Sequence, residues 1–246
     1  TAIGQNAQTA NLTGLYNTSL GYDTLKGNTT GSRNIAIGHK ALDAPDTESD
    51  NIAIGYDALG GAVAGGEKNV VIGNYAGDAL TSADHTTAVG YGALGSLQTG
   101  AWNTAIGKDA AGSLVSGSYN TILGQRAGYG ITGSGNVAIG HQAVNSSGNS
   151  GDYNIAIGYD VAKTGFKAGY WNVAIGFNAM EGSGSPSGAQ YNVAVGGYAI
   201  KDIVDGEKNT AFGHASGENI TTGDNNITIG WSAGDNLTTG DNNVVI

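Results

Sequence analysis

The sequence contains no cysteine and few basic residues. Without cysteine there is no disulfide framework and no thiolate metal site, so an extracellular protein of this kind must be held by backbone hydrogen bonds, packing or association. The chain has 10 Lys and Arg against 20 Asp and Glu, a net charge of −10. Binding to nucleic acid or to an anionic membrane surface needs clustered basic residues, so we expect neither partner.

Long hydrophobic runs are also lacking. No apolar stretch approaches the roughly 20 residues that span a bilayer, so we expect no membrane insertion by this segment. No signal peptide is visible either. The sequence opens and stops inside a repeat, at Thr1-Ala2-Ile3-Gly4 and Val244-Val245-Ile246. We therefore expect a segment of a longer polypeptide.

Glycine is abundant, with 44 residues, and it recurs at a fixed period. The repeated motif is Asn-x-Ala-Ile-Gly, as at Asn34–Gly38, Asn103–Gly107 and Asn154–Gly158. The motif Asn positions are mostly 17 residues apart, and Thr86 replaces Asn once. The third residue after the motif Gly is usually Ala. Such internal repeats are typical of solenoids, whose stacked units bury a continuous column.

The motif alternates in the manner of a β-strand. Its Ile, and the Thr, Ile or Val two residues earlier, share one face, whereas Asn, Ala and Gly share the other. We predict that Ile37, Ile106, Ile157 and their equivalents form the core. The Asn column, including Asn34, Asn103 and Asn154, predicts a hydrogen-bonded amide ladder, or alternatively a left-handed turn at the strand start. The motif Gly, as in Gly38, Gly107 and Gly158, indicates positive φ or a close backbone approach.

These patterns predict an all-β fold: a parallel β-solenoid, or β-roll, of about fourteen 17-residue coils. We expect one repeat domain over residues 1–246, with longer units absorbing insertions in loops such as Glu181–Gly188. A helical repeat is disfavoured, because glycine would cost about 1 kcal/mol at each helix-interior position. The small Ala and Gly columns suggest close approach of several chains, in a homotrimer or a polymer.

No constellation of residues indicates catalysis. Three of the four His follow the motif Gly in separate repeats, so they do not form one site. We therefore predict a non-enzymatic protein with no cofactor and no metal. Asp23, Asp57, Asp109 and Asp160 share one repeat column and are interpreted as solvated turn residues, with Ca²⁺ coordination as the alternative.

Aromatic residues concentrate in two columns. The residue after the motif Gly (the post-Gly column) and the residue before the motif Asn (the pre-Asn column) hold most of them. Stacked coils turn such columns into stripes, and exposed aromatic stripes often mark interaction sites. The alternative is that the rings cover strand ends or pack between chains. The densest part, proposed to bind a surface glycan or a neighbouring fibre, comprises Trp102, Tyr119, Tyr153, Tyr159, Trp171, Phe177 and Tyr191.

The Asn-x-Ala-Ile-Gly-x-x-Ala-Gly unit resembles the YadA-like head repeats of trimeric autotransporter adhesins. It is also similar to repeats in bacteriophage tail fibres that end in an intramolecular chaperone. The resemblance covers nearly the whole chain, although the unit here is longer than the adhesin unit. It implies a left-handed parallel β-roll, three chains around a common axis and a role in surface attachment.

We therefore expect a structural segment of an extracellular, cell-surface or virion fibre that serves attachment, with a surface glycan or host receptor as its partner. A self-assembling filament or matrix protein without a specific receptor is the alternative. Ice binding is less favoured, because the column after the motif Asn mixes Thr with Ile and Val and is expected to face inward.

Overall fold

The computed structural model describes residues 1–44, 47–61, 66–164, 166, 168–182 and 188–246. The predicted insertion loop at 181–188 therefore lies largely outside the described residues. Contacts group the chain into two compact units, residues 1–120 and 121–246. Both units are built from short parallel strands, and no helix occurs in the described ranges.

Each repeat contributes one strand of two or three residues, placed where the motif predicts it. In the first unit the strands are β1 (Ala2–Ile3), β2 (Thr18–Leu20), β3 (Ile35–Ile37), β4 (Ile52–Ile54), β5 (Val70–Ile72), β6 (Thr87–Val89) and β7 (Thr104–Ile106). In the second they are β8 (Thr121–Leu123), β9 (Val137–Ile139), β10 (Ile155–Ile157), β11 (Val173–Ile175), β12 (Val193–Val195), β13 (Thr210–Phe212), β14 (Ile227–Ile229) and β15 (Val244–Val245).

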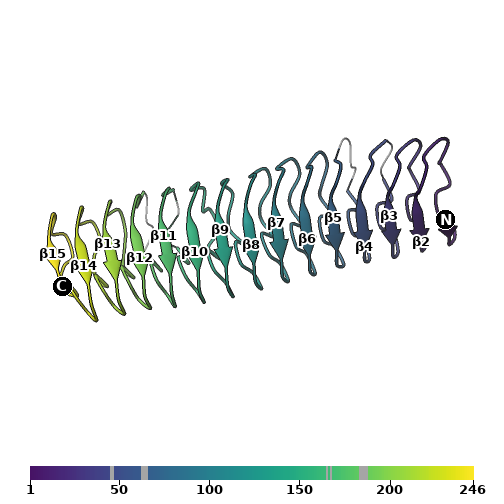
Figure 1. The fold of residues 1–246 in the computed structure, drawn as a ribbon. Coiled ribbons are helices and arrows are strands. Elements are labelled where there is room, and N and C mark those ends of the chain that lie inside the picture. Colours follow the sequence, from purple (N-terminus) through teal and green to yellow (C-terminus); the bar gives the residue numbers. More distant parts are fainter. Residues whose placement is uncertain (45–46, 62–65, 165, 167, 183–187) are drawn as a thin grey trace. The chain divides into compact units, whose positions relative to one another are not determined.

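Within each unit, successive strands lie side by side and run in the same direction (Figure 1). The motif residues are in register, so that Ile35, Ala36 and Ile37 pair with Ile52, Ala53 and Ile54. The backbone closes the ladder: Ile35 N donates to Asn51 O at 2.8 Å, and Gly55 N donates to Ile37 O at 2.8 Å. The predicted parallel β-solenoid of about fourteen coils is confirmed.

The interior is the reverse of the predicted one. The small middle residue of each strand faces inward, and Ala36, Ala53 and Ala105 are fully buried. The flanking residues face outward, and Ile106 is 43% exposed. The prediction of an Ile core was therefore wrong. Leucines from the turns fill much of the interior of a 17-residue coil. The strand side therefore has room for small residues such as Ala and for Asn.

Those leucines come from the turns that follow several of the strands. Leu42, Leu59 and Leu94 follow the buried Ala of the turn and are themselves fully buried. A second group, including Leu97 and Leu114, enters from the next turn. Since burial of a Leu side chain contributes roughly 1.5–3 kcal/mol, each coil has its own apolar interior and does not depend on another chain for one.

The predicted Asn ladder is confirmed, and its amides also serve the backbone. Asn34 Nδ2 donates to Glu48 O at 2.8 Å, and Asn34 Oδ1 accepts from Asn51 N at 2.9 Å. In the second unit the amides join directly, with Asn172 Nδ2 donating to Asn154 Oδ1 at 3.0 Å. These Asn residues are buried, and they are not among the positive-φ residues. The left-handed alternative for this column is therefore wrong.

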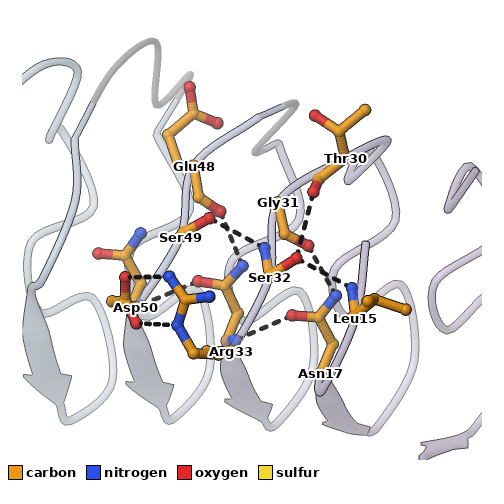
Figure 2. A network of polar contacts seen from close by, with 11 residues as sticks. Leu15, Asn17, Thr30, Gly31, Ser32, Arg33, Glu48, Ser49 and Asp50 are labelled. Carbon is orange, nitrogen blue, oxygen red and sulfur yellow. Dashed lines mark hydrogen bonds and ion pairs between the residues drawn. The ribbon is translucent and has the colours of Figure 1, made fainter. Parts of the chain in front are cut away.

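Beside the ladder runs a more exposed polar column, shown close up in Figure 2. Ser32 N donates to Ser49 Oγ at 3.0 Å, one coil further on. Arg33 and Asp50 form a bidentate ion pair, with N–O distances of 2.6 and 2.8 Å. Because both side chains are partly solvated, we attribute only about 0–1 kcal/mol to this pair.

Each coil bends through several residues with positive φ. In the coil that follows β3 they are Gly38 (129°), Lys40 (54°), Leu42 (49°) and Asp50 (65°). The motif Gly was predicted to have positive φ, and it does. The other three sites are non-glycine residues, for which this conformation is uncommon. Hydrogen bonds between coils hold them there, since Lys40 N bonds to Tyr22 O and Leu42 N bonds to Ala58 O.

Candidate functional site

The outward face of the strands is an exposed apolar surface. Its two columns are the residues on either side of the buried strand residue, for example Ile52 and Ile54 in β4 or Thr104 and Ile106 in β7. The column after the motif Asn was expected to face inward, and that expectation was wrong: its residues are half-buried or exposed. We call these two columns together the outer sheet face. Contiguous apolar surface of this kind marks interaction sites.

The pre-Asn column carries stacked rings in each unit. His85 and Trp102 lie face to face with ring centroids 4.0 Å apart, and Trp102 faces Tyr119 at 6.5 Å. In the second unit Tyr153 stacks on Trp171 at 4.7 Å. These residues also have positive φ, for example 60° at Trp102. Each stacked pair contributes roughly 0.5–1.5 kcal/mol beyond burial, which offsets the backbone strain.

The post-Gly column forms a longer ladder in each unit. Tyr22, His39 and Tyr56 stack at 5.2 and 5.0 Å. His141, Tyr159 and Phe177 stack at 4.9 and 5.8 Å. The seven residues predicted as a stripe are all exposed. Six of them meet in pairs on neighbouring coils of one unit: Trp102 with Tyr119, Tyr153 with Trp171, and Tyr159 with Phe177. The prediction that the rings align coil by coil is therefore supported separately for residues 1–120 and 121–246.

Two members of this ladder were not predicted from the sequence. Tyr75 and Tyr198 stand one residue later than the post-Gly column, in coils where Asn74 and Gly197 follow the motif Gly. Their rings meet their neighbours edge-on, at 61° and 73° for Tyr75 and at 81° and 71° for Tyr198. The shift by one residue changes the direction from which the side chain enters the ladder. A Tyr next to a non-aromatic column residue was the signal available in the sequence.

Stacking within the chain occupies most ring faces. Trp102 has a neighbouring ring on each side, at centroid distances of 4.0 and 6.5 Å. Trp171 stacks on Tyr153 only, and Tyr191 makes no ring contact among the described residues. Trp171 and Tyr191 are 54% and 50% exposed. A flat ligand such as a sugar needs an open ring face, so these two exposed residues are the candidates for such a contact.

The Asp column does not assemble a metal site. Asp23 accepts from Asn6 Nδ2 at 2.8 Å and pairs with Lys26 at 3.2 Å. The hydrogen bond from Asn6 holds the pKa of Asp23 below its usual value. Lys40 separates Asp23 from Asp57 in the column, and the described residues contain no group of three or more potential ligands. The structure thus brings no carboxylates of this column together.

The chain was compared with protein-family models, with curated proteins and with solved structures, and no significant match was found. The part of the chain that the structure describes holds no helix of sufficient length and hydropathy to cross a membrane. The outer sheet face and the aromatic ladders are therefore the features from which we infer a function.

Proposed function

We propose that this chain is a non-enzymatic structural segment of a fibre, extracellular or on a virion, that associates through its outer sheet face and serves attachment to a surface or host cell. The observation that carries the proposal is the accessibility of two mainly β-branched columns on a regular parallel sheet, one apolar throughout and the other mostly Thr, Ile and Val. A role in attachment follows from the resemblance to adhesin heads and tail fibres together with the exposed aromatic columns.

The assembly proposed is a homotrimer, as the resemblance implies. The small Ala columns, predicted to allow close approach of chains, cannot act this way, because they are buried inside the coil. The motif Gly residues lie against the backbone of the next coil of the same chain. The outer sheet face replaces them. Ile and Val side chains, with Thr, Leu or Phe in some coils, supply a mainly apolar surface that repeats along the sheet, as in obligate interfaces.

Charges placed on the outer sheet face should abolish this association. Ile37 and Ile54 are paired neighbours on β3 and β4 and are half-exposed in the single chain. We expect the double variant Ile37→Glu/Ile54→Glu to shift the native mass from trimer to single chain at micromolar concentration, because unpaired charges in an interface cost several kcal/mol. The far-UV circular dichroism should keep its β signature, since neither residue is in the interior.

Leu12→Glu is the matched control, because Leu12 is 79% exposed and lies outside the strands. It should leave the native mass unchanged. A wild-type mass of one chain at micromolar concentration would refute the trimer, and large polydisperse species would favour the self-assembling filament without a specific receptor.

The proposed attachment ligand is a surface glycan at Trp171 and Tyr191. Sugar rings stack on open aromatic faces, and these two exposed residues are the candidates for such a contact. We expect Trp171→Ala/Tyr191→Ala to reduce binding to immobilised surface polysaccharides at least about tenfold, the equivalent of 1.4 kcal/mol. Trp102→Ala should lower the free energy of unfolding by about 1–2 kcal/mol. It should leave binding unchanged, because the Trp102 ring already packs against neighbouring rings of the chain.

Equal loss of binding in both variants, or loss in neither, would argue against a glycan site at these residues. Loss of the trimer in Trp171→Ala/Tyr191→Ala would instead assign the rings to packing between chains.

A further inference from the structure

Tyrosine–tyrosine contacts are confined to one place among the ring contacts of the described residues. Tyr56 and Tyr75 have ring centroids 5.2 Å apart, and Tyr75 and Tyr91 are 5.7 Å apart. These three residues come from consecutive coils of the first unit and are 41%, 38% and 52% exposed. The other ring contacts pair Tyr with His, Phe or Trp, or His85 with Trp102.

The edge-on geometry at Tyr75 places its ring against two other phenol rings. Two phenols couple through the ring carbons next to their hydroxyl groups. Tyr75 meets Tyr56 at 61° and Tyr91 at 73°, so the edge of one ring approaches the other ring. Burial and then the neighbouring Tyr56 and Tyr91 raise the pKa of Tyr75, and a contact between the Tyr56 and Tyr75 hydroxyl groups adds to the same effect.

We propose that Tyr75 is a site of oxidative cross-linking, which forms dityrosine with Tyr56 or Tyr91 when a haem peroxidase and hydrogen peroxide act on the chain. Each of two phenols gives up one electron and its hydroxyl proton, and the resulting phenoxyl radicals form one carbon–carbon bond. The hydrogen on each coupling carbon then returns to the oxygen of its own ring. Overall, two tyrosines and one hydrogen peroxide give one dityrosine and two water molecules.

The product would be a covalent link between adjacent coils in a chain that has no disulfide. Such a link restricts the unfolded chain, as a disulfide does. It would join the coil of Asn51 to the coil of Asn69, or the latter to the coil of Thr86. The proposal does not depend on attachment or on the outer sheet face.

The test is treatment of the native protein with horseradish peroxidase and hydrogen peroxide, followed by intact-mass and peptide mass spectrometry. We expect the loss of two hydrogens within one chain, a cross-linked peptide pair containing Tyr75, and a rise of about 5 °C in the unfolding midpoint. Tyr75→Phe should abolish the intrachain product. Tyr198→Phe is the matched control, because Tyr198 has the same edge-on placement but contacts Phe177 and His214.

Three outcomes would overturn the proposal: an intrachain dityrosine that persists in Tyr75→Phe, a product that is equally lost in Tyr198→Phe, or cross-links that form only between chains and scale with protein concentration. Tyr56→Phe and Tyr91→Phe separately identify the coupling partner.

Discussion

Replacement of Gly55 by Val is expected to destabilise the first unit by at least about 3 kcal/mol. Gly55 has φ of 138°, a conformation that is essentially restricted to glycine and strained for any β-branched residue. A Cβ atom there would lie 2.6 Å from both the carbonyl carbon and the carbonyl oxygen of Gly73 in the next coil. Both atoms belong to the backbone of the ladder, so neither can move without disturbing the coil. Chemical denaturation monitored by circular dichroism measures the loss.

Gly188→Ala is the control for this variant. A Cβ at Gly188 meets no atom of the described residues within 4 Å, and its φ is not in the left-handed region. We expect its free energy of unfolding to change by no more than about 0.5 kcal/mol. If Gly55→Val were as stable as the wild type, the motif glycines of adjacent coils would not approach each other closely enough to exclude a side chain.

Replacement of Asn172 by Ala should cost the second unit about 3–5 kcal/mol. Asn172 Nδ2 donates to Ala189 O at 2.8 Å and to Asn154 Oδ1 at 3.0 Å, and its Oδ1 accepts from Asn192 N at 3.0 Å. Truncation therefore leaves polar groups of three residues without this partner in a buried place, at roughly 1–3 kcal/mol each, with partial relaxation. The measurement is again the free energy of unfolding.

The same ladder offers the reverse substitution. Thr86 stands where the other coils have Asn, and among the described residues its hydroxyl donates to Asp84 O, at 3.3 Å. Thr86→Asn should restore the amide and stabilise the first unit by about 1 kcal/mol. If the ladder stabilises the fold, Asn172→Ala lowers the free energy of unfolding and Thr86→Asn raises it. An unchanged free energy of unfolding in Asn172→Ala would contradict this role.

The sequence by itself determined the period, the position of every strand and the polar ladder. Because the motif alternates like a strand and repeats in register, parallel stacking is the arrangement that pairs every motif with its copies in the neighbouring coils. The Asn ladder follows because only a parallel stack brings equal residues of successive coils into contact. The positive φ of the motif Gly was predictable for a similar reason, since glycine is the residue that adopts this conformation without strain.

Only the tertiary structure decided which face of the strand is the interior. Alternation has the same period whichever face is buried, and hydrophobicity favoured Ile37 over Ala36. In the narrow coil the small face is buried instead, because Leu42 and its equivalents occupy the interior from the turns. These turns contain non-glycine residues with positive φ, which no local sequence pattern indicates. The closed coil also decides that Tyr56 stacks while Tyr75 stands edge-on, since one residue of displacement around a bend changes the direction of a side chain.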